Sequence, residues 1–293
     1  MIKIFADAAS NLYNEFLKEK QSSIKVMNIK LTVGERMVNC YDDDFDINEV
    51  SSYFYEEMRK DTPVGTSQIT PSEYINYFET EVKKGNDVIC FTMAKGISGT
   101  YNSACLAAEE VNQKYSHNKV VIIDSMTAGF GEGLLALHAE QLVKQGKTLE
   151  EIVKDCEEYK YFERSEFTVG DVKYLIKTGR LNKTFGKFLG KLNIQVLLKN
   201  TLESNIGFAL AVVGRKMAIK RLAKMVIDKI DRKLDQIVYI THCNCLDDAN
   251  KLKEYLIAEK INNIEVRPYD IISGSHIGPD SLAIFYVAKE KAK

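Results

Sequence analysis

Residues 87–111 have the sequence DVICFTMAKGISGTYNSACLAAEEV, and their pattern indicates the fold class. Residues 87–93 are mostly apolar and do not alternate with polar ones, which predicts a strand buried on both faces. A turn with two glycines follows, and from residue 104 onward small apolar side chains recur at helical spacing. A buried strand that leads into a helix is the unit from which helix-covered parallel sheets are built.

Two more stretches of the first half have the character of buried strands. They are IKIFAD at 2–7 and KVVIIDS at 119–125, and GEGLLALHAEQLVKQG at 131–146 has the spacing of a further helix. Together these elements predict an α/β domain with a parallel sheet over residues 1–150.

A parallel sheet also predicts where a ligand binds. Ligands of such sheets lie beyond the carboxyl ends of the strands. We therefore expect Asp7, Met93–Ser98 and Ser125 to border one crevice.

The second half, residues 151–293, has a less regular pattern. It predicts short β-rich runs at 167–169 and 192–198, strands at 236–242, 264–270 and 281–289, and helices from about 148, at 215–233 and at 246–260. This mixture indicates an α+β domain with a mixed or antiparallel sheet.

Composition excludes several classes of protein. Hydrophobic residues make up 45% of the 293 residues and charged residues 28%, which is typical of a globular chain. The 40 basic residues nearly balance the 41 acidic ones, so no net field favours nucleic acid. No run of about 18 apolar residues and no basic start followed by an apolar run occurs, so we expect a cytoplasmic protein without stable membrane insertion. Most of the six cysteines should be reduced core residues.

A helix start at Thr70 leaves neighbouring polar residues unexplained. Thr70, the following proline and Glu73 have the spacing of a capping box. This cap does not use the run Thr66–Gln68, which comes just before it.

A second polar cluster lies where the strand of residues 87–93 becomes a helix. Ser98, Gly99 and Thr100 fall at the predicted helix N-terminus, where free amides and two hydroxyls suit an anion. A plain serine cap with a glycine turn explains the same residues, so both interpretations remain open.

Two further side chains stand out in glycine-rich segments. His276 is predicted to lie in a loop between two strands, flanked by glycines that let a ligand approach closely. Arg180 lies in a basic turn with Lys177 and Lys183 and could bind a phosphate or carboxylate. An incidental loop histidine and a solvated basic turn are the alternatives.

The sequence gives little support for a metal site or for a known catalytic motif. His242, Cys243 and Cys245 lie too close in sequence for a standard zinc site, and no second cluster has finger or ribbon spacing, so we expect no metal. GISGT, residues 96–100, lacks the second glycine of a nucleophile elbow. The glycine runs after the strands match no nucleotide-binding motif, so we expect no cofactor.

The polar clusters are part of an ordered set of motifs that covers nearly the whole chain. The set resembles the DegV family, and its motifs are FADAASNL (5–12), GTSQITPSEY (65–74), GISGTYNSA (96–104), VIIDSMTAGFGEGLLALHA (121–139), LIKTGRLNK (175–183), GRKMAIKRL (214–222) and SGSHIGPDSLAIFY (273–286). Each motif is weak alone, but their order and spacing are specific.

The resemblance implies a two-domain fold that holds a long-chain fatty acid between its domains. FakB-type members of the family present the acid to a fatty acid kinase, which makes acyl phosphate. Carried over by motif, the group around the carboxylate consists of Thr66, Ser67, Ser98, Gly99, Thr100 and His276. Arg180 would lie at the pocket mouth or face the kinase.

The resemblance also favours a lipid carrier over an enzyme, and we expect a monomer. Two rivals remain open. One is a hydrolase that cleaves an acyl ester through Ser98 and His276, and the other is a regulatory module that binds a different apolar ligand.

Overall fold

The computed structural model describes residues 1–40, 45–183 and 193–292. A four-stranded parallel sheet forms the first half of the molecule, in the order β2-β1-β6-β7. Its strands are β1 Ile2–Asp7, β2 Lys25–Met27, β6 Asp87–Thr92 and β7 Val120–Asp124. The parallel sheet predicted from residues 2–7, 87–93 and 119–125 is confirmed.

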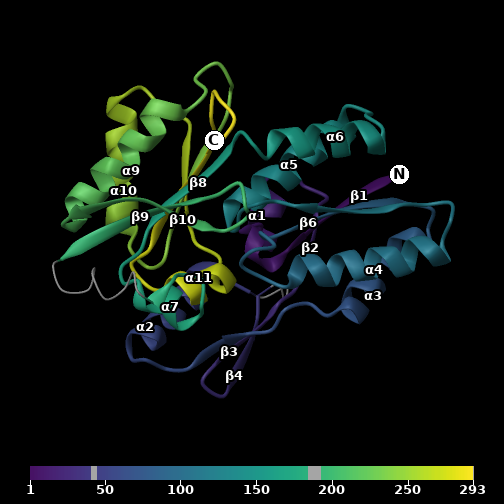
Figure 1. Cartoon of the computed structure of the whole chain (residues 1–293), viewed down its shortest axis with the longest axis horizontal. Coiled ribbons are helices and arrows are strands. Elements are labelled where there is room, and N and C mark those ends of the chain that lie inside the picture. The colour runs from purple at the N-terminus through teal and green to yellow at the C-terminus, as the bar shows by residue number, and fades with distance from the viewer. Residues whose placement is uncertain (41–44, 184–192, 293) are drawn as a thin grey trace.

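Helices cover both faces of this sheet. Figure 1 shows α5 and α6 on one side of β1 and β6, and α3 and α4 on the other. These helices are α3 Pro71–Val82, α4 Thr100–Lys114, α5 Phe130–Lys144 and α6 Leu149–Tyr159. The predicted capping box of α3 is present, because Thr70 accepts from the Glu73 amide and Glu73 accepts from the Thr70 amide.

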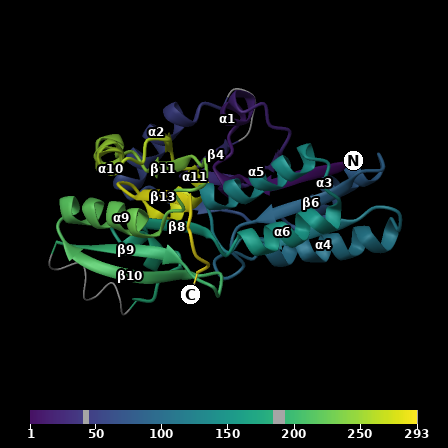
Figure 2. The same ribbon diagram turned by 90° about the horizontal axis from the view of Figure 1, so that it is seen from above.

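A six-stranded mixed sheet, in the order β10-β9-β8-β13-β11-β12, forms the second half. Its pairs are antiparallel except for β11 with β12. The strands are β8 Glu163–Thr168, β9 Ile194–Asn200, β10 Ile206–Val213, β11 Val238–His242, β12 Ile264–Pro268 and β13 Leu282–Val287. Helices α9 Arg215–Lys229 and α10 Leu246–Ala258 pack on one face of this sheet. Figure 2 shows the two sheets side by side, with the N-terminus on the first and the C-terminus near the second.

The other elements of the described chain are helices outside these two layers and a third, smaller sheet. They are η1 Ala8–Ser10, α1 Asn14–Glu19, α2 Ile47–Arg59, α7 Lys173–Lys177, α11 Ile271–Ile277 and a small antiparallel sheet of β3 Lys30–Val33, β4 Arg36–Asn39 and β5 Val64–Thr66. The chain thus leaves the first sheet after β2. In the segment that follows, α2 packs against β12 and β5 packs against α11.

Two hydrophobic cores hold these layers together. Alternate residues of β13 face opposite ways: Phe285 belongs to the core shared with the first sheet, and Ile284 to the core beneath α9 and α10. In the shared core, Phe130 of α5 stacks on Tyr239 of β11 with ring centroids 3.9 Å apart. The two halves are therefore packed through aromatic contacts rather than merely linked.

Most predicted elements are present, but their ends differ. The helix predicted at 215–233 ends at Lys229, where Ile230 pairs with Ala288 instead. Leu192, the first residue of a predicted strand run, lies outside the described residues. The division into domains at residue 150 stays a prediction. Within the described part of the chain, no helix combines the length and the hydrophobicity needed to cross a bilayer.

Candidate functional site

A pocket opens between the carboxyl ends of the parallel strands and the second sheet. Its cavity has a volume of about 210 Å³. A void of ~10–15 Å³ suffices for one water molecule, so there is room for an organic ligand. The lining includes every residue predicted for the site: Thr66, Ser67, Ser98, Gly99, Thr100, Arg180 and His276.

The Ser98–Thr100 turn lies between β6 and α4. The Ser98 hydroxyl accepts from the Thr100 amide at 3.2 Å and is 2.7 Å from the Thr100 hydroxyl. Gly99 is the N-cap residue of α4 and offers no side chain. The two hydroxyls therefore gather at a helix N-terminus that lines a pocket, which favours ligand binding over a plain cap.

The Thr66–Gln68 run borders the same end of the pocket. β5 ends at Thr66, whose Oγ1 lies 3.3 Å from Nε2 of His276. Gln68 donates to the Ser103 hydroxyl of α4 at 3.1 Å. Thr66 thus contacts α11 and Gln68 contacts α4, while Ser67 between them lines the pocket.

His276 lies on helix α11, so the prediction of a loop was wrong. Asp270 caps this helix by accepting from the Ser273 amide at 2.6 Å, and all its residues except His276 are buried. Burial, and then the nearby positive charge of Arg180, lowers the pKa of His276 to about 4. The ring is neutral at pH 7, and Nδ1 finds no hydrogen-bond partner among the described residues.

Arg180 lines the pocket instead of pointing from an open turn. It is half-buried, while Lys177 and Lys183 are exposed. Its Nε donates to the Ile97 carbonyl at 3.1 Å and its Nη1 to the Thr178 carbonyl at 2.5 Å. Burial lowers its pKa, but an arginine remains charged. A cation is therefore held beside the Ser98 turn and close to His276.

The expected crevice is only partly correct. Met93, Ala94, Ile97 and Ser98 line the pocket, whereas Asp7 and Ser125 are buried and do not. Asp7 accepts from the amides of Met93 and Ala9 instead, and its own amide donates to Glu132 at 2.9 Å. Burial raises the pKa of Asp7 to about 6. Asp7 thus fixes the start of the β6–α4 turn from below the surface.

Several pocket residues were missed by sequence reasoning. They come from the second half or from the turn after β7, and include Thr127, Ser165, Phe167, Leu175, Tyr269 and Phe285. Thr127 lies in the quoted motif 121–139, but no local pattern indicates that its side chain meets Ser165.

The segment His242–Cys245 provides no metal centre. The described residues contain no group of three or more His, Cys, Asp and Glu placed to hold a metal ion. Cys243 is buried, and burial raises the pKa of both Cys243 and Cys245, the latter to about 12. Both are neutral thiols at pH 7.

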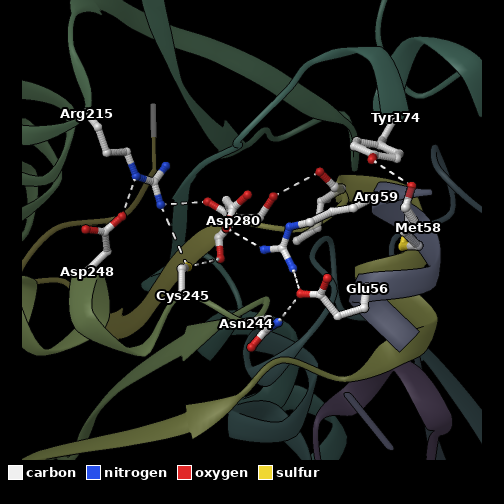
Figure 3. Close-up of polar contacts among 11 residues, drawn as sticks. Glu56, Met58, Arg59, Tyr174, Arg215, Asn244, Cys245, Asp248 and Asp280 are labelled. Atoms are coloured by element: carbon white, nitrogen blue, oxygen red, sulfur yellow. Dashed lines mark hydrogen bonds and ion pairs between the residues drawn. The ribbon is translucent and has the colours of Figure 1, made fainter. Parts of the chain in front are cut away.

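A polar network next to the pocket joins α2 to the loop before β13 (Figure 3). Arg59, the last residue of α2, pairs with Asp280 at 2.7 Å and with Glu56 at 2.6 Å. Arg215 donates to the Asp280 carbonyl at 2.6 Å and pairs with Asp248 at 2.8 Å. The network thus links α2, which precedes Thr66 in the chain, to the loop that follows His276.

The geometry does not form a catalytic dyad. The Ser98 hydroxyl contacts Thr100, and His276 contacts Thr66. Among the described residues, no carboxylate hydrogen-bonds His276 to orient it as a base. This arrangement counts against the hydrolase.

Comparison with known proteins finds relatives that match this chain over nearly its whole length. A family model described as "Uncharacterised protein, DegV family" matches residues 1–289. A DegV domain-containing protein of Clostridium perfringens is 30% identical over 290 residues, which is 98% of each chain.

Solved structures share the fold. A DegV family protein from Ruminococcus gnavus, refined with vaccenic acid, has a TM-score of 0.82 at 23% identity, with 97% of this chain and 98% of that chain covered. The Streptococcus pneumoniae Fatty Acid Kinase (Fak) B3 protein, loaded with linoleic acid, has a TM-score of 0.81 at 20% identity, with 98% and 99% covered.

Proposed function

The chain belongs to the DegV family, and we propose that it is a carrier that binds a long-chain fatty acid in this pocket and presents the carboxylate to a fatty acid kinase. One observation carries the proposal. The polar residues predicted for the head group gather at one end of the pocket, where Ser67, Gln68 and Gly99 are exposed, whereas Tyr269, Ala283 and Phe285 in its wall are buried.

The apolar wall supplies affinity. Burial of about 15 methylenes contributes on the order of 10 kcal/mol gross, at ~0.8 kcal/mol each. Part of that offsets the cost of ordering the chain and of association. Phe167, Leu175 and Phe285 offer an apolar surface of the right kind.

The polar end supplies partners for the carboxylate. A buried oxygen without a donor costs about 1–3 kcal/mol. Hydroxyls of Thr66 and Ser98 can donate, and the cation of Arg180 lies close by. Neutral hydroxyls do not lock the carboxylate in a bidentate fork, so one oxygen stays accessible to a phosphoryl group.

Relatives support the choice of ligand. Structures of the same fold hold vaccenic acid in the Ruminococcus gnavus protein and linoleic acid in the Streptococcus pneumoniae protein. The name of the latter, Fatty Acid Kinase (Fak) B3, supports a kinase as partner. Action as a monomer stays a prediction.

A paired measurement on Arg180 tests the presentation of the acid. We expect Arg180→Ala to keep measurable acid binding but to slow acyl phosphate formation with a cognate kinase, because a cation near the carboxylate stabilises charge on the transferring group. Lys177→Ala, an exposed neighbour outside the pocket lining, is the control. Equal rates for Arg180→Ala and wild type would remove Arg180 from the transfer step, and complete loss of acid binding would assign it to the binding site alone.

A further inference from the structure

The buried wall of the pocket is not uniformly apolar. Thr127, Ser165 and Tyr269 all line it, and each is at most 6% exposed. None belongs to the head-group residues predicted above. Hydroxyls in the wall of a pocket for a plain hydrocarbon chain need an explanation, because a methylene cannot hydrogen-bond them.

Thr127 and Ser165 form a hydrogen-bonded chain with a buried acid. Their hydroxyls lie 2.5 Å apart, and the Ser165 hydroxyl lies 2.6 Å from Oε1 of Glu163. Burial raises the pKa of Glu163 to about 8, so this carboxyl is mostly protonated at pH 7. The backbone of α5 lies close to these two hydroxyls at Gly131, which has no side chain. A Cβ at this position would lie 2.6 Å from Thr127 Oγ1 and from Ser165 Oγ.

The Tyr269 hydroxyl, from the segment between β12 and α11, lies close to Gly129, two residues before Gly131. A Cβ at Gly129 would lie 2.5 Å from this hydroxyl. No hydrogen bond joins this hydroxyl to another described residue, and Tyr269 lines the pocket while its ring packs against Phe285. Burial raises the pKa of Tyr269 well above its usual value, so the phenol keeps its proton and remains a donor without a partner.

The position of Tyr269 relative to the head group follows from α11. Tyr269, Ile272 and His276 line the pocket in turn. A helix rises about 1.5 Å per residue, so the first turn of α11 lies roughly 8 Å from His276, and Tyr269 precedes that turn. A ligand atom next to Tyr269 is therefore several bonds away from a carboxylate held near His276.

We propose that the preferred ligand is a long-chain fatty acid with a hydroxyl group in the middle of its chain, bound by the Tyr269 hydroxyl beside Thr127 and Ser165. This inference rests on the proposed function, whose site it subdivides. A hydroxyl both donates and accepts. It can accept from Tyr269 and donate to the Thr127–Ser165 pair, whose hydroxyls retain lone pairs. An unsubstituted chain leaves the phenol without a hydrogen-bond partner.

The test compares matched acids on the full-length protein after removal of bound lipid. Octadecanoic, 10-hydroxyoctadecanoic and 2-hydroxyoctadecanoic acids are titrated against a bound fluorescent fatty acid. We expect the 10-hydroxy acid to bind roughly 2- to 10-fold more tightly than octadecanoic acid, the range of one net hydrogen bond. The 2-hydroxy acid should gain nothing at this subsite.

Variants of the lining residues show which of them binds the hydroxyl group of the fatty acid. Tyr269→Phe should abolish the preference, and Ser165→Ala should reduce it. Tyr74→Phe is the matched control, because Tyr74 is also a buried tyrosine without a hydroxyl partner among the described residues, yet it lies outside the pocket lining. The Tyr74→Phe variant should prefer the 10-hydroxy acid over octadecanoic acid as strongly as wild type does.

The outcomes separate this inference from the proposed function. Binding of octadecanoic acid with equal or weaker binding of the 10-hydroxy acid would overturn the hydroxyl subsite alone. A preference that survives in both Tyr269→Phe and Ser165→Ala would overturn it as well. If none of the acids binds, the carrier function and the subsite fail together.

Discussion

The pocket has two walls that are built in different ways. The first wall is the pair of turns after β6 and β7, with Met93–Thr100 and Met126–Ala128. The turn after β6 is held by Asp7 and Asp124, which accept from its amides, and the turn after β7 by Asp124 and Ser125. The second wall combines β8, β13 and α11, whose residues are far apart in the sequence. The first wall therefore supplies the hydroxyls of Ser98 and Thr100. The second wall supplies His276, Ser165 and the apolar surface of Phe167 and Phe285, which exists only when the halves pack.

The strongest test of this difference is Phe285→Ala in the second wall. Phe285 is buried in the shared core, and large-to-small changes of this kind cost about 3–5 kcal/mol. Ile97→Ala in the first wall is the matched control, and it should cost less because Ile97 is only partly buried. Chemical denaturation measures both. Equal losses for the two variants would mean that the walls do not differ as described.

The next prediction uses the buried acid behind the second wall. Burial raises the pKa of Glu163 from 4.5 to about 8, so the folded chain keeps a proton that the unfolded chain has lost between these values. The stabilising effect of this proton on Glu163 is complete below about pH 4.5 and is lost as the pH rises to about 8. Glu163→Gln, which mimics the protonated acid, should therefore match wild type near pH 4.5.

Above pH 8 the glutamine variant should be more stable by a few kcal/mol, since one pKa unit corresponds to ~1.36 kcal/mol. Denaturation at several pH values measures the difference. Glu158→Gln, at an exposed carboxylate, is the control and should show no comparable trend. A constant difference between Glu163→Gln and wild type across this range would show that Glu163 is ionised in the folded protein.

At the polar end, single hydroxyls should matter for the ligand more than for the fold. We expect Ser98→Ala and Thr66→Val each to weaken fatty acid binding by about 1–3 kcal/mol, because each removes a donor to a buried acceptor. Displacement of a fluorescent fatty acid measures the change. Thr80→Val, on the exposed surface of α3, is the control. Unchanged affinity in both site variants would place the head group elsewhere.

The smallest effect is expected in the network of Figure 3. Asp280 is about half exposed, so the loss of its ion pair with Arg59 in Asp280→Asn should cost about 0.2–1 kcal/mol. High salt should reduce the cost further. A loss well above this range would show that the tie between α2 and the loop before β13 holds the pocket together.

Sequence alone could predict the first wall well. A buried strand that becomes a helix fixes where Ser98 and Thr100 lie, and the capping box at Thr70 isolates Thr66–Gln68 as polar residues with another role. The fold class follows from the same alternation of strands and helices. These signals are local, so one chain segment is enough to read them.

The second wall could not be predicted in the same way. His276 was expected in a loop, because one glycine and two serines make ISGSHI a poor helix; the Asp270 cap and burial override that propensity. Arg180 was expected in an open turn or at the pocket mouth; it lines the pocket and donates to the Ile97 carbonyl, a contact that the sequence does not indicate. Tyr269 meets Gly129 across the interface of the halves, a contact that no local pattern records.

The central claim is that this pocket holds a fatty acid, and native mass spectrometry of protein that has never been denatured tests it most directly. We predict a mass above that of the bare chain, a difference equal to one long-chain fatty acid, and release of that acid on extraction. A bare mass that does not change after incubation with octadecanoic and 10-hydroxyoctadecanoic acids would contradict the account.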